Sequence, residues 1–86
     1  MISSVRGAVL GVRGNTVVVE VGGVGLAVAV TPQQALSVRI GTEVALRTVL
    51  IVREDDLALY GFATEHELRV FDLLRGVTGV GPKSAL

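Results

Sequence analysis

The chain has 86 residues, of which half are apolar and only 3% aromatic, and its eight basic and eight acidic residues cancel to zero net charge. This length allows one small domain with a short addition, and the absence of cysteine excludes a disulfide framework and a thiolate metal site. Zero net charge counts against strong nucleic-acid binding by the chain alone, because phosphate contacts supply most of that affinity. No signal peptide or membrane-spanning run is predicted, which fits a cytoplasmic protein.

Five strands are predicted from apolar, valine-rich runs separated by turn signals. A turn is expected at Gly14-Asn15, and the cluster Gly22–Gly25 turns the chain into the third strand. We interpret this cluster as a bulge or sharp bend in a barrel, because the G-x-G-x-x-G spacing of a dinucleotide site fails at Val28. The predicted strands are residues 2–12, 17–21, 26–30, 42–52 and 57–62.

Two helices are predicted from their capping residues. Thr31-Pro32 combines an N-cap with a proline suited to the first helical position, which predicts a short helix over 33–38 that Gly41 ends. Thr64 followed by Glu67 has the form of a capping box and opens a second helix. The predicted apolar face of that helix is Leu68, Phe71, Leu73 and Leu74. Five strands with a helix between the third and fourth match an all-β OB-fold, a five-stranded Greek-key barrel.

The stretch from Gly76 to Leu86 predicts a phosphate-binding turn that opens a helix. Gly79 and Gly81 let the main chain lie close against a ligand, and the free N–H groups at a helix start favour an anion. A Walker A loop is rejected because Pro82 separates Gly81 from Lys83 and the preceding segment is helical. Two interpretations remain, a helix-hairpin-helix that grips a nucleic-acid backbone and an ordinary helix–helix turn. The candidate phosphate-binding residues are Gly79, Val80, Gly81, Lys83 and Ser84.

An acidic segment, Arg53-Glu54-Asp55-Asp56, separates the fourth and fifth predicted strands. Its simplest explanation is a solvated hairpin turn, since Asp is a common turn residue. A metal site would need further convergent ligands, and His66 is the single histidine of the sequence. Tyr60 and Phe62 are expected to fill the barrel rather than to stack on bases.

Five ordered segments together give the chain a resemblance to the RuvA family. The segments are Val5-Arg6-Gly7, Val21–Gly25, Ile51–Asp55, Leu59–Phe62 and Gly79–Lys83. Members of this family are the non-catalytic subunits that bind Holliday junctions in bacterial branch migration, during recombination and DNA repair. The resemblance implies an OB-fold over residues 1–62, the beginning of a helix-hairpin-helix domain over 63–86, and assembly into a fourfold-symmetric tetramer on four-way junction DNA.

The resemblance also implies roles for the acidic segment. Glu54 and Asp55 match an acidic pin at the tetramer centre, where carboxylates would repel phosphates and favour strand separation. Asp56 extends this acidic run, and Arg53 either pairs with a carboxylate or meets a phosphate. No metal or other cofactor is implied. Family members are considerably longer, so we expect the contact with the hexameric RuvB motor to lie outside these residues. The alternative is a self-associating OB-fold whose DNA-binding surface is incomplete.

Overall fold

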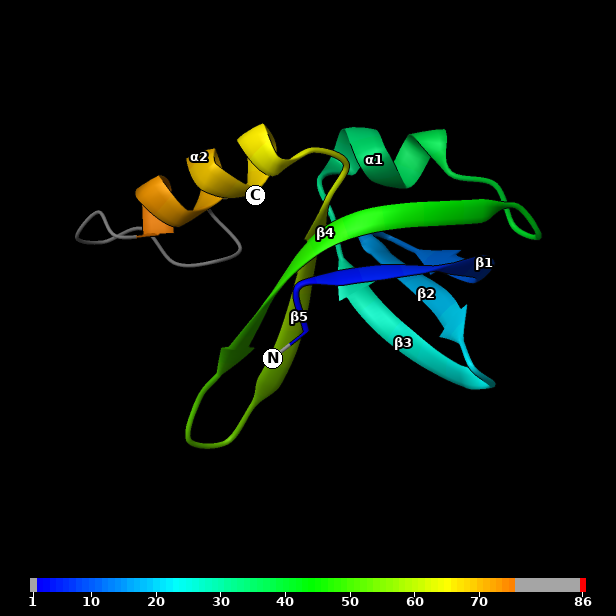
Figure 1. Cartoon of the computed structure of the whole chain (residues 1–86), viewed down its shortest axis with the longest axis horizontal. Helices are drawn as coiled ribbons and strands as arrows, with labels where there is room; N and C mark the ends of the chain where they lie inside the picture. Colours follow the sequence, from blue (N-terminus) through cyan, green and yellow to red (C-terminus); the bar gives the residue numbers. More distant parts are fainter. Residues whose placement is uncertain (1, 76–85) are drawn as a thin grey trace.

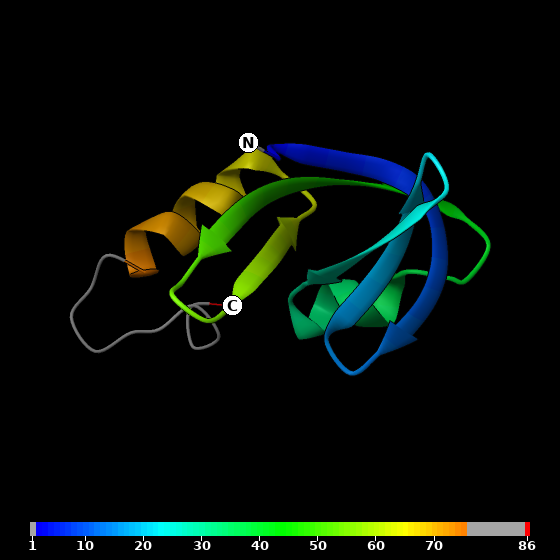
Figure 2. The same cartoon turned by 90° about the horizontal axis from the view of Figure 1, so that it is seen from below.

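The computed structural model describes residues 2–75 and residue 86 of the chain. The strands form a closed barrel in the order β1-β2-β3-β5-β4, which confirms the predicted OB-fold (Figures 1 and 2). Neither helix in these residues is long and apolar enough to cross a membrane. The elements are β1 (Ser4–Arg13), β2 (Thr16–Val21), β3 (Val24–Ala29), α1 (Pro32–Ser37), β4 (Glu43–Val52), β5 (Leu57–Phe62) and α2 (Glu65–Arg75).

Strand β1 belongs to both halves of the barrel. Its first half pairs antiparallel with β4 and its second half with β2, so that Ala8 lies opposite both Glu43 and Glu20. The register with β2 shifts between Val9 and Gly11, where β1 carries one extra residue. Such a bulge bends a strand and increases its twist. The bend lets one ten-residue strand follow the barrel wall past both of its neighbours.

The glycine cluster forms the turn of the β2–β3 hairpin, which confirms the turn and sharp bend predicted there, and a bulge occurs in β1. Gly22 and Gly23 have φ values of 57° and 86°, and Val21 and Val24 pair directly on either side of them. A two-residue hairpin loop with positive φ at both positions is a type I′ turn, which glycine adopts without steric cost. The third strand therefore begins at Val24, two residues before the predicted start at Leu26.

The barrel core receives inward-pointing side chains from all five strands, and most of its buried members are valines, with a leucine from each of β4 and β5. Its closure depends on a short parallel pairing between β3 and β5, in which Val28 lies opposite Leu59. Helix α1 covers one end of the barrel, and the Thr31 Oγ1 accepts the Gln34 N–H at 3.1 Å as the predicted N-cap. The buried members of this core are Val5, Val9, Val17, Val19, Val28, Val30, Ala35, Leu46 and Leu59.

Helix α2 packs beside the barrel through an aromatic cluster. The Thr64 Oγ1 accepts the Glu67 N–H at 3.2 Å and donates to the Glu67 carboxylate at 3.1 Å, so Thr64 caps the helix as predicted. The centroid of the Phe71 ring lies 5.3 Å from that of Tyr60 and 4.9 Å from that of Phe62. Tyr60 and Phe62 are buried, yet they lie in this outer cluster and not in the barrel core. Alternate residues of β5 face opposite sides of the sheet, which explains the difference.

The apolar face predicted for α2 is wrong at one position. Phe71 is buried and Leu68 packs against the outer cluster, whereas Leu73 is 75% exposed. Residues in a helix are about 100° apart, so Leu73 lies about 200° around the helix from Phe71. Leu74 lies nearer to Phe71 in rotation and is 41% exposed. Only a narrow stripe of α2 therefore contacts the barrel.

Candidate nucleic-acid interface

The acidic segment forms the tip of the β4–β5 hairpin, which reaches beyond the barrel on the side away from α1 (Figure 1). The Arg53 N–H donates to the carbonyl oxygen of Asp56 at 2.8 Å and continues the ladder by one step. Glu54 and Asp55 are therefore the two central residues of the turn. We call Arg53–Asp56 the acidic tip. All four residues are exposed.

The carboxylates of Glu54 and Asp55 are not used to hold the tip together. Within residues 2–75 and 86, neither side chain makes a hydrogen bond or an ion pair, and Arg53 makes no ion pair with a carboxylate. Asp56 has a local role, because its Oδ1 accepts the Leu57 N–H at 2.8 Å where β5 begins. The structure thus shows an exposed turn, in which two of the three carboxylates have no partner among the described residues.

The part of the chain that the structure describes contains no set of side chains arranged to bind a metal ion. There, no group of three or more His, Asp or Glu side chains is placed to hold a metal ion. His66 is exposed in the first turn of α2. Tyr60 and Phe62 are 5% and 3% exposed, so their ring faces are covered by the outer cluster and do not offer a platform for base stacking.

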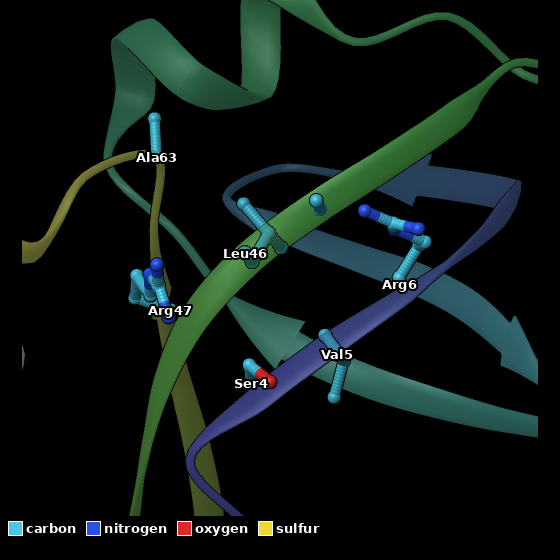
Figure 3. Close-up of a pocket in the computed structure, with 7 residues that line it drawn as sticks. Ser4, Val5, Arg6, Leu46, Arg47 and Ala63 are labelled. Carbon is cyan, nitrogen blue, oxygen red and sulfur yellow. The ribbon is translucent and has the colours of Figure 1, made fainter.

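A second charged surface, which sequence reasoning missed, lies on the outer wall between β1 and β4. Figure 3 shows Arg6 on β1 and Arg47 on β4 at a hollow of about 370 Å³. Ser4 lies opposite Arg47 and Ala45 lies opposite Arg6, so the two arginines are diagonal neighbours, roughly 7–8 Å apart at Cα. The hollow is lined by Ser4, Val5, Arg6, Ala45, Leu46, Arg47 and Ala63.

This hollow is separate from the acidic tip. Along β4, Arg47 lies roughly 20 Å from Arg53 at about 3.3 Å per residue. Neither Arg6 nor Arg47 makes an ion pair within the described residues. The alternation of β1 and β4 could have indicated that both side chains face outward. The pairing of β1 with β4 brings Arg6 and Arg47 together although they are some forty residues apart in the sequence. This pairing could not be predicted from either strand alone.

The predicted phosphate-binding residues lie outside the described residues. They are Gly79, Val80, Gly81, Lys83 and Ser84. Helix α2 ends at Arg75, whose guanidinium lies 5.8 Å from the centroid of the Phe71 ring and 3.1 Å from Asp72 Oδ1. Both partners belong to α2, so these contacts stabilise the last turn of the helix itself, just before the predicted site in the sequence.

Comparison with known protein families assigns the fold and its tip to one family. The family described as "RuvA N terminal domain" matches residues 1–61, which include the whole barrel up to the penultimate residue of β5 and the acidic tip. The chain belongs to this RuvA family. The resemblance carried by the five sequence segments is confirmed, and four of those segments begin within the matched residues.

Curated RuvA relatives match almost the entire chain. Each is named "Holliday junction branch migration complex subunit RuvA". The relative from Clavibacter michiganensis is 60% identical over 86 residues, which is all of this chain and 40% of the relative. Those from Leifsonia xyli and Streptomyces griseus are 57% and 49% identical, over 100% and 99% of this chain and 42% and 41% of their own lengths. The chain thus spans about two-fifths of the length of these RuvA proteins.

Proposed function

We propose that the chain is a non-catalytic DNA-binding module that recognises four-way junctions. It acts within a fourfold-symmetric tetramer and supports branch migration by a separate RuvB motor, which binds outside these residues. The observation that carries the proposal is the acidic tip, where a protruding hairpin presents the carboxylates of Glu54 and Asp55 without a hydrogen-bond or ion-pair partner among residues 2–75 and 86. Membership of the RuvA family and the names of the relatives support it.

The acidic tip provides selectivity by repulsion. Duplex DNA carries one negative charge per roughly 1.7 Å of its axis, so an unbroken duplex laid across the tip brings several phosphates near Glu54 and Asp55. A carboxylate and a phosphate about 7 Å apart in water repel by about 0.6 kcal/mol, which is roughly a threefold effect on affinity for each such pair. At the centre of an open junction the strands diverge, and the tip then occupies a region that phosphates have left.

Affinity must come from other residues, because carboxylates cannot bind phosphates. We assign it to the turn around Gly79, Val80 and Gly81, with Lys83 and Ser84 as phosphate ligands at the start of a helix. Arg53 is free of internal ion pairs within the described residues, and we assign it to a phosphate beside the crossover. Residues 63–86 then begin a helical DNA-binding domain, attached to the barrel through α2.

The test compares junction and duplex binding with assembly on the same samples. The proteins are the 86-residue chain and a chimera in which this chain replaces the matching segment of a full-length relative. We expect the chimera to bind a four-way junction more tightly than a linear duplex of the same sequence, and the chain alone to bind feebly because it has zero net charge. Assembly seen by light scattering without any response to DNA would favour the self-associating barrel, and equal affinity for both DNAs would refute junction recognition.

A further inference from the structure

Two apolar side chains stand directly beneath the acidic tip. Val52 and Leu57 form the last strand pair of the β4–β5 hairpin, and they are 69% and 65% exposed. The preceding pair on the same face is Leu50 and Leu59; Leu59 is a buried member of the barrel core, and Leu50 is partly buried and packs against it. The core-facing side of the hairpin therefore extends beyond the barrel, where its side chains are exposed to solvent. We call Val52 and Leu57 the apolar collar.

Neither α2 nor a second copy of the chain suits the collar. The outer cluster with α2 packs on the opposite face of the hairpin, where Ile51 and Ala58 contact it. A stable interface between copies needs about 800 Å² from each partner, and two side chains supply only a fraction of that area.

The negative charges of Glu54 and Asp55 determine which part of a nucleic acid approaches the collar. Glu54 and Asp55 repel phosphates, so beside these two carboxylates an uncharged part of a nucleic acid is favoured over its backbone. A nucleobase released from its pair is uncharged and presents a flat apolar face. DNA-deforming proteins stabilise unstacked base steps with inserted apolar side chains, among them leucine.

We propose that the apolar collar receives nucleobases that lose their stacking at the junction crossover. The inference rests on the proposed function and adds a second part to it. The carboxylates of the tip keep the sugar-phosphate strands apart, and Val52 and Leu57 hold the bases that separation exposes. The hairpin then stabilises the open crossover both by repelling backbones and by binding bases.

The test replaces the collar by Val52→Thr with Leu57→Thr, which places a β-branched residue suited to a strand at both positions and removes most of the apolar surface. A matched control is Val21→Thr with Val24→Thr, the exposed strand pair that flanks the Gly22–Gly23 turn at another corner of the barrel. Both variants are made in the chimera. Four-way junctions carry 2-aminopurine at the crossover, since the fluorescence of this base rises when it loses its stacking.

We expect the parent and the Val21/Val24 control to raise the fluorescence equally. The collar variant should lose at least half of the rise and bind the junction about fivefold more weakly, with unchanged affinity for duplex. If the collar variant at saturating concentration gave the full rise in 2-aminopurine fluorescence, the collar inference would be wrong and junction recognition would be unaffected. A change in particle size by light scattering would overturn it in favour of contact between copies. A parent that does not prefer the junction would refute the proposed function, and the collar inference with it.

Discussion

Closure of the barrel at Gly61 gives the sharpest test of the fold. A Cβ at this position would lie 2.6 Å from Cγ1 of Val28 and 3.2 Å from Cδ1 of Leu46. Val28 is 0% and Leu46 is 2% exposed, so neither side chain has space to move. Overpacking of a core typically costs about 1–3 kcal/mol, and Gly61→Ala should lie in the upper half of that range because the contact is at the β3–β5 closure.

The matched control is Gly11→Ala in β1, where a Cβ meets nothing within 4 Å and φ is not in the left-handed region. This change should leave stability equal or raise it by up to about 1 kcal/mol, because alanine restricts the unfolded chain. Thermal unfolding of the 86-residue chain, followed by circular dichroism, measures both. A loss of about 2–3 kcal/mol corresponds to a fall in Tm of roughly 10–20 °C. If the Gly61→Ala and Gly11→Ala variants had the same Tm, the packing described at β5 would be wrong.

Substitutions at three further positions test α2 and the predicted phosphate site. Phe71→Ala should cost about 3–5 kcal/mol in urea unfolding, since Phe71 is 1% exposed, and a cost below about 1 kcal/mol would show that α2 does not dock through this ring. Thr64→Ala should lower the free energy of unfolding by about 1 kcal/mol in the same measurement, and Thr64→Ser should lower it much less because serine keeps a capping hydroxyl. Equal stability of Thr64→Ala and the parent would show that this cap does not stabilise α2. Lys83→Ala in the chimera should weaken junction and duplex binding alike and reduce the salt slope by about one, and an unchanged slope would remove Lys83 from the site.

Local signals were sufficient to predict the elements of the fold. Thr31 and Thr64 cap the two helices as their sequence context indicates, and the apolar runs with intervening turns locate all five strands. The errors arise where local patterns permit more than one geometry. The turn predicted at Gly22–Gly25 does not specify that the third strand begins at Val24, and a leucine-rich helix does not reveal that Leu73 turns away from a narrow contact stripe.

Features that depend on distant segments could not be predicted. The apolar run of β4 continues to Val52, but whether that residue is buried depends on where the other strands end. The Arg6–Arg47 hollow depends likewise on the pairing of β1 with β4. The position of the acidic tip is evident from its residues. A solvated turn would have the same residues, so only the family resemblance indicates a role in junction binding.

The central claim is that the carboxylates of the acidic tip set the preference for a junction. Glu54→Gln with Asp55→Asn removes two negative charges and keeps the shape of both side chains. Its control is Glu20→Gln with Glu43→Gln, which removes two exposed carboxylates on either side of Ala8 in the barrel wall. Both are made in the chimera, with the fold checked by circular dichroism.

The decisive measurement is the ratio of junction to duplex affinity at low and moderate salt. Relief of repulsion should tighten duplex binding by the tip variant at low salt and lower its ratio at least threefold, with a smaller change at moderate salt because exposed charges are screened. The Glu20/Glu43 control should keep the parent ratio. A tip variant with the parent ratio at both salt concentrations would contradict the account and leave the acidic segment as a solvated turn.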